Sequence, residues 1–121
     1  MRDRDKATAN DKRYALFDAC DWGCVACGAF LAEHGTPQLA HRVPKSRFRL
    51  EAYGPEVMHN PLNLVPVCGL ACNSHVNIGN RPVEANALLQ RIIRVVTGVE
   101  PEPNMRREYE ALRESFEEEK G

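Results

Sequence analysis

Two short-spaced cysteine pairs constrain this chain more than any other feature of its sequence. Cys24 and Cys27 form a C-x2-C pair followed by Gly28, and Cys68 and Cys72 form a C-x3-C pair. Each pair can present two thiolates from one tight turn, so together they suit the tetrahedral coordination of a single Zn²⁺. Forty residues separate the pairs, so such a zinc site would close a long insertion that carries other elements.

The alternatives for these cysteines are a disulfide pair and a redox C-x-x-C motif. The opening residues, MRDRDKATA, lack the apolar run of a secretory signal, so we expect a reducing, cytoplasmic environment that disfavours disulfides. A redox motif would explain Cys24 and Cys27 but leave the second pair unexplained. We therefore expect a structural zinc site, with Cys20 as a small buried apolar residue outside it.

The insertion contains further motifs in a definite order. QLAHRVPKSR combines a short apolar stretch ending in His41 with a basic loop around Pro44, NLVPVC forms a second apolar stretch, and CNSH follows it. This series, over residues 24–75, resembles the HNH endonucleases, which are ββα-metal (His-Me finger) nucleases. The resemblance implies a small α+β fold in which a ββα-metal core carries a four-cysteine zinc site and flanking helices.

The resemblance also implies roles for three residues. His41 matches the general base that removes a proton from the attacking water, a task for which a neutral imidazole is suited. Asn63 matches the middle Asn, whose carbonyl would accept a hydrogen bond from that imidazole. Asn73 matches a ligand of one Mg²⁺ or Mn²⁺, which would act as a Lewis acid on the phosphate. The implied activity is metal-dependent hydrolysis of DNA phosphodiester bonds, leaving 5′-phosphate and 3′-hydroxyl ends.

One position departs from the family pattern. Many members have Asp or His directly before the general base, as the second metal ligand, whereas this chain has Ala40. His75 and His59 are the nearest candidates to complete a catalytic metal site, although His59, in HNP, is equally typical of a turn. The departure leaves two alternatives open: a zinc-containing nucleic-acid-binding module that lacks catalysis, and a structural subunit of a larger nuclease or phage assembly.

Basic residues gather in one segment although the net charge is only −1. Residues 38–50 contain no acidic residue and four cations, Arg42, Lys45, Arg47 and Arg49. Residues 100–121 contain eight Glu against four Lys and Arg. A local basic segment beside the proposed site indicates contacts with DNA phosphates, and simple solvation of a loop is the alternative.

A chain of 121 residues is expected to form one domain, over residues 10–121, after a disordered segment at 1–9. The zinc-containing core is expected at 24–80. Apolar residues at three-four spacing predict two C-terminal helices, at about 82–98 and 102–119. These helices are expected to pack on the core, with a homodimer contact or assembly contact as the alternative for the last one. No apolar run approaches the length of a membrane span.

Turn and periodicity signals predict the remaining elements. They are a helix from Asn10 to about Cys20, a turn or strand from Phe30 to His34 ended by Gly35, strands at Leu39–Val43 and Leu62–Val67, a loop or brief helical turn over residues 52–61, and a helix from Cys72 to about Gly79.

Overall fold

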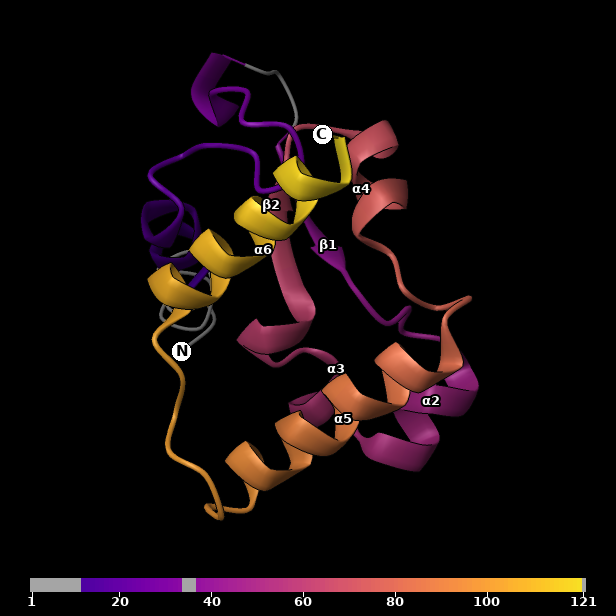
Figure 1. Cartoon of the computed structure of the whole chain (residues 1–121). Helices are drawn as coiled ribbons and strands as arrows, with labels where there is room; N and C mark the ends of the chain where they lie inside the picture. The colour runs from indigo at the N-terminus through magenta and orange to yellow at the C-terminus, as the bar shows by residue number, and fades with distance from the viewer. Residues whose placement is uncertain (1–11, 34–36, 121) are drawn as a thin grey trace, which may run out of the picture.

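The computed structural model describes residues 12–33 and 37–120. It is a small α+β fold, mostly helical, with one two-stranded antiparallel sheet (Figure 1). The predicted N-terminal segment 1–9, the helix start at Asn10 and the turn end at His34 and Gly35 lie outside the described residues. Residues 12–19 are helical, as predicted, and the 3-10 helix η1 (Leu31–Glu33) follows the first cysteine pair.

The sheet joins two short strands that are distant in the sequence. β1 (Gln38–His41) pairs antiparallel with β2 (Leu64–Val67), which places His41 opposite Leu64. Both strands are shorter than the predicted ranges 39–43 and 62–67. β2 begins late because the 3-10 helix η2 (Pro61–Asn63) occupies the preceding residues.

The connection between the strands is more helical than the sequence pattern indicates. α2 (Arg47–Tyr53) begins at Ser46, whose hydroxyl accepts a hydrogen bond from the Arg49 N–H, and ends at Gly54. The short helix α3 (Pro55–Met58) follows at once, with Pro55 in its first turn. The predicted basic loop is therefore loop only as far as Ser46, and its last two cations lie on α2.

α4 (Leu70–Val76) follows β2 and packs against both strands. It begins two residues before the predicted start at Cys72 and ends before Gly79. The chain order in this region is thus strand, strand, helix, with the two helices α2 and α3 inserted between the strands (Figure 1). The second cysteine pair lies at the junction of β2 and α4.

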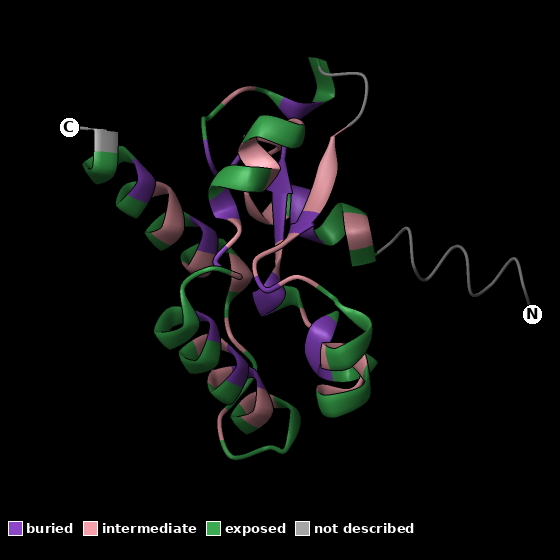
Figure 2. Cartoon of the chain, turned by 90° about the vertical axis from the view of Figure 1, so that its right-hand side faces the viewer, coloured by how far each residue is buried: buried purple, intermediate pink, exposed green. Residues whose placement is uncertain are grey.

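Two amphipathic helices complete the fold, close to the predicted ranges. α5 (Pro82–Val96) buries Ala85, Leu89 and Ile92, and α6 (Met105–Lys120) buries Tyr109 and Phe116. Figure 2 shows these buried positions along one side of each helix, with exposed residues on the other. An ion pair joins the two helices. The Arg91 guanidinium of α5 donates two hydrogen bonds, of 2.6 and 2.9 Å, to the two carboxylate oxygens of Glu108 on α6.

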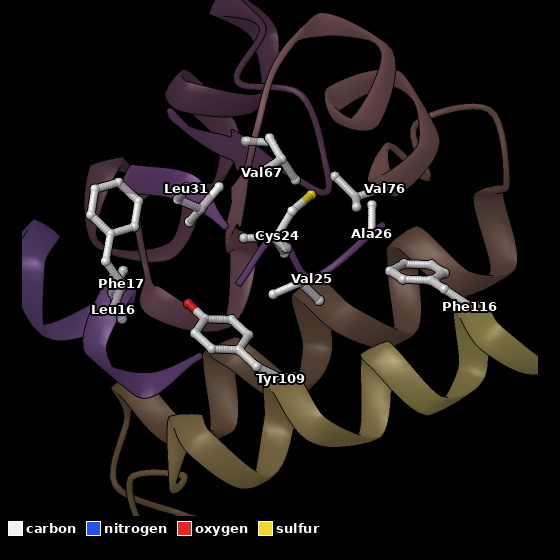
Figure 3. Close-up of a cluster of buried hydrophobic side chains, with 12 residues drawn as sticks. Leu16, Phe17, Cys24, Val25, Ala26, Leu31, Val67, Val76, Tyr109 and Phe116 are labelled. Carbon is white, nitrogen blue, oxygen red and sulfur yellow. The ribbon is translucent and has the colours of Figure 1, made fainter. Parts of the chain in front are cut away.

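Buried apolar side chains form two clusters. The first includes Cys24 and side chains of the sheet, and Figure 3 shows Tyr109 and Phe116 pointing into it from α6. The Tyr109 hydroxyl donates to the Leu64 carbonyl at 2.8 Å, which fixes α6 against the start of β2. The second cluster lies under α2, α3 and α5 and includes Met58 and Ile92. None of the helices in the described part of the chain is long and apolar enough to cross a membrane.

Candidate functional site

Four cysteine sulfurs meet where the first turn approaches the junction of β2 and α4. The Sγ atoms of Cys24, Cys27, Cys68 and Cys72 all lie within 4.8 Å of one another. The Sγ separations Cys27–Cys68 and Cys68–Cys72 are both 3.7 Å. Four sulfurs held about 2.3 Å from a tetrahedral Zn²⁺ lie about 3.8 Å apart. The four cysteines thus have the spacing that a structural Zn²⁺ requires, as the sequence predicts.

Protonation of these thiols would be coupled to the binding of a cation. Burial raises the pKa of the Cys72 thiol, and the neighbouring sulfurs raise it further. Burial raises the pKa of Cys68 as well. Four thiolates at this spacing repel one another and need a positive ion, so binding of Zn²⁺ would displace protons from the cluster.

The turn that carries the first pair is held from two sides. Gly28 has a φ of 84° and donates its N–H to the Cys24 carbonyl at 2.7 Å. The Arg113 guanidinium on α6 donates to the Ala26 carbonyl at 3.1 Å and fills the space where a Gly28 side chain would lie. On the other side, the Val25 N–H donates to the Pro66 carbonyl of β2 at 3.1 Å.

Cys20 lies outside the cluster. Its half-buried Sγ donates to the Phe17 carbonyl at 3.2 Å. Burial raises the pKa of the Cys20 thiol to about 11, so this sulfur stays protonated at neutral pH and is a poor nucleophile or ligand. The expectation that Cys20 is a small packing residue agrees with this environment.

Two histidines face each other at the end of the hairpin. His41 is the last residue of β1, and His59 ends α3. The His41 Nε2 and His59 Nδ1 atoms are 3.0 Å apart, and the rings meet nearly edge to face at 70° with centroids 5.2 Å apart. Of the two histidines named as candidates beside His41, His59 is the one that the structure brings to it.

The environment of His41 favours a neutral imidazole. Burial lowers the pKa of His41 below its ordinary value, and the nearby side chains of His59 and Lys45 lower it further. An imidazole with a pKa below 6.5 is mostly unprotonated at pH 7 and can accept a proton. Among the described residues, no carboxylate contributes to this pKa shift.

Asn63 lies at the end of the hairpin. The sequence predicts a hydrogen bond from the His41 imidazole to Asn63, but the Asn63 side chain pairs with backbone groups instead. Its side chain is fully buried. The Oδ1 atom accepts from the Val43 N–H at 2.8 Å, and Nδ2 donates to the carbonyls of Val43 and Met58 at 3.1 and 2.8 Å. The Asn63 backbone carbonyl accepts a hydrogen bond from the backbone N–H of Arg42. Asn63 therefore ties the loop after His41 to the end of α3, the helix that presents His59.

Asn73 lies away from His41. Its Nδ2 atom donates to Oε1 of Gln38 at 3.0 Å, at the far end of β1. A strand rises about 3.3 Å per residue, so Gln38 and His41 are about 10 Å apart along β1. Ala40, between them, is buried and paired with Val65. The two positions that the resemblance gives to metal ligands are thus occupied by Ala40, which has only a methyl group, and by Asn73, whose amide is hydrogen-bonded to Gln38.

His75 also lies away from His41. Its Nε2 atom is 3.8 Å from a Glu119 carboxylate oxygen, and its ring lies against Phe116 with centroids 4.9 Å apart. Both partners belong to α6, so His75 contributes to the contact between α4 and α6 and not to the histidine pair. The sequence alternative that placed a catalytic metal on His75 is not supported by this position.

The four predicted DNA-binding cations have different environments. Arg42 is half-buried and donates to the Val76 carbonyl at the end of α4. Arg47 pairs with Glu51 one turn later at 3.3 Å, both being exposed. Arg49 donates to the Pro44 carbonyl, and Lys45 is exposed. Lys45 and Arg47 are thus exposed at the surface, Arg49 is half-buried, and Arg42 ties β1 to the end of α4.

Sequence reasoning missed an exposed aromatic among these cations, Phe48, and missed the helix that carries it. The alternation Arg-Phe-Arg in SRFRLEAY was the available signal.

Comparisons with known protein families, with curated proteins and with solved structures found no match for this chain.

Proposed function

We propose that this chain is a zinc-stabilised DNA endonuclease of the ββα-metal type, in which His41 is the general base. The observation that carries the proposal is the pair formed by His41 and His59 at the end of a hairpin that adjoins a four-cysteine cluster. The strand, strand, helix order of β1, β2 and α4 and the exposed cations after His41 add support.

The hydrogen bond between the imidazoles decides which nitrogen acts as the base. If the His41 Nε2–H donates to His59 Nδ1, the His41 Nδ1 atom is unprotonated and free to accept a proton from water. The resulting hydroxide would attack phosphorus while the bond to the 3′ oxygen breaks. The proton gained by His41 would leave a cation that remains hydrogen-bonded to His59. In this arrangement His59 orients the base, the role that the resemblance gives to Asn63.

The leaving oxygen needs a cation or a proton donor, which the resemblance assigns to Mg²⁺ or Mn²⁺. A hard cation such as Mg²⁺ prefers oxygen ligands, mainly carboxylates. The groups beside His41 are an imidazole and an ammonium, and Asn73 is held by Gln38. This donor set is a poor fit for Mg²⁺. Imidazole nitrogens instead favour ions such as Zn²⁺, Ni²⁺ or Fe²⁺.

A second candidate function rests on the same positions. Buried Ala40 and the Asn73–Gln38 hydrogen bond replace the expected metal ligands with groups that stabilise the hairpin. These features favour a nucleic-acid-binding module that has the fold and the cations but no catalysis. A structural subunit of a larger nuclease or phage assembly, using α6, is the remaining alternative.

Cleavage of supercoiled plasmid separates these candidates. Nicking by the wild type that disappears in His41→Ala, with zinc content and DNA affinity retained, supports the endonuclease. DNA binding without nicking in any divalent cation supports the binding module. Absence of DNA binding in both proteins supports the structural subunit.

A further inference from the structure

Phe48 is the most exposed aromatic side chain of this chain. All eight Phe, Tyr and Trp residues lie within the described part, and Phe48 has 78% of its surface exposed, against 51% for Tyr14 and Phe30. Phe48 belongs to neither buried cluster, so its ring is free to contact another molecule.

The geometry of α2 explains this exposure. Leu50 and Tyr53, three residues apart, pack against the second cluster and define the inner side of the helix. At 100° per residue, position 48 projects to the opposite side. Phe48 therefore points away from the protein while its helix is anchored from below by Leu50 and Tyr53.

The surroundings of Phe48 are basic. Arg47 and Arg49 flank it, and Lys45 precedes it in the loop from His41. Arg47 already pairs with the nearest acid, Glu51, which leaves Lys45 and Arg49 to attract an anion.

Arg49 also borders a shallow polar hollow of about 430 Å³ between this segment and the end of α4. Its lining contains no acidic residue and consists of Pro44, Arg49, Ser74, Asn77, Gly79 and Asn80. A guanidinium, a hydroxyl and two amides are groups that hydrogen-bond to a phosphodiester backbone.

We propose that residues 45–49, here named the Phe48 surface, bind a nucleic acid strand with unpaired bases. Phe48 stacks on one base, while Lys45 and Arg49 contact the phosphates. The charge favours a polyanion over an apolar protein partner, and an aromatic ring among cations is the arrangement that binds single strands through stacking and phosphate contacts. This inference rests on the proposed nuclease function and specifies its substrate class as single-stranded or locally opened DNA.

Fluorescence anisotropy tests the proposal with the full zinc-loaded chain and three labelled probes. The probes are a single strand, a matched duplex and a duplex with a central unpaired loop. Stacking of one base on an aromatic ring corresponds to about 5- to 150-fold in Kd. We expect Phe48→Ala to lose affinity by this order for the two probes with unpaired bases, and by less than about twofold for the matched duplex. Phe48→Trp should retain the affinity and show quenched emission on binding.

Two controls make the result specific. Val83 is similarly exposed, at 83%, on α5, and Val83→Ala should leave all three affinities unchanged. Lys45→Ala should reduce the salt dependence of binding by about 0.7 in log–log slope on the single strand, whereas Phe48→Ala should leave that slope unchanged. An equal loss for all three probes in Phe48→Ala, or no loss for any, would overturn the proposal.

The outcome is separable from that of the proposed function. Preference for unpaired DNA that depends on Phe48, in a protein that cuts nothing, would retain the Phe48 surface and reject the nuclease. Cleavage that depends on His41, with binding indifferent to Phe48, would retain the nuclease and reject the Phe48 surface.

Discussion

The Nε2 atom of His41 lies 3.0 Å from the Nδ1 atom of His59, 18 residues later in the chain. His41 is the last residue of β1, and His59 caps the end of the short helix α3. Asn63 fixes this relationship, because its buried amide holds the loop after His41 and the last turn of α3 together. The pair is therefore built into the hairpin.

The first prediction concerns the pH dependence of His41. Its pKa is lowered by burial, by His59 and by Lys45, so the neutral base predominates at pH 7. Its activity should be lost only as the pH falls through a value below about 6.5. Lys45→Ala removes one positive neighbour, so the His41 pKa should rise and the acid limb of the rate profile should move to higher pH. NMR titration of the imidazole resonances measures this shift directly.

His75→Ala is the control for that titration, because His75 faces Glu119 on α6. It should leave the His41 resonances and the rate profile where they are in the wild type. A wild-type His41 that titrates above 6.5, or an unchanged titration in Lys45→Ala, would contradict the assigned environment.

The second prediction concerns zinc. Structural Zn²⁺ sites in zinc-finger peptides contribute about 10–16 kcal/mol of apparent binding free energy, so Cys68→Ser and Cys72→Ser should give poorly folded protein. Metal analysis of the wild type should find about one zinc per chain. Cys20→Ser should leave the zinc content unchanged, since the Cys20 thiol lies outside the cluster and donates a hydrogen bond to the Phe17 carbonyl. A zinc-free wild type with a full near-UV circular dichroism spectrum would refute the site.

The third prediction concerns the buried amide of Asn63. Asn63→Ala leaves one N–H and two carbonyls of Val43 and Met58 without their partner. Each buried unpaired group costs about 1–3 kcal/mol, so the loss of stability should be on the order of 3 kcal/mol or more. Urea unfolding with zinc present measures it. Asn73→Ala, which removes one partly buried contact to Gln38, should cost about 1 kcal/mol or less, and equal costs for the two variants would contradict this assignment.

The fourth prediction concerns the turn at Gly28. An alanine there would meet the Arg113 guanidinium and would adopt a φ of 84°, so Gly28→Ala should break the Arg113–Ala26 contact. Gly98 has a similar φ of 82° with nothing within 4 Å of an added side chain. Gly98→Ala should therefore show only the backbone cost of about 1–2 kcal/mol. Competition with a chelator should show faster zinc loss from Gly28→Ala than from Gly98→Ala. Identical rates of zinc loss would contradict the role of Arg113 in holding the turn that carries Cys24 and Cys27.

Local sequence signals predicted much of this fold. The cysteine spacing identified the four sulfurs that meet, because two tight turns can present them without knowledge of the intervening chain. α5 and α6 followed from apolar residues at three-four spacing. α2 was missed because its seven residues bury no side chain completely, so its apolar periodicity is too weak to mark it as a helix.

The candidate site was predicted less completely because it depends on long-range contacts. The distance between His41 and His59 depends on how α3 folds back on the hairpin, which no local pattern encodes. For the same reason Asn63 was assigned to the imidazole, whereas its amide pairs with backbone groups of Val43 and Met58. Asn73 and His75 are two residues apart on α4 and face β1 and α6 respectively, as the helical rotation between them requires.

The most direct test of the central claim is the initial rate of plasmid nicking by wild type and His41→Ala at pH 7, in Mg²⁺, Mn²⁺, Ni²⁺ and Zn²⁺. Loss of a general base typically lowers a rate by about 10²- to 10⁴-fold. We predict a loss of that order in His41→Ala, with its zinc content and DNA affinity equal to those of the wild type. Wild-type protein that binds DNA but nicks none of it in any of these ions, or equal rates for the two proteins, would contradict the claim.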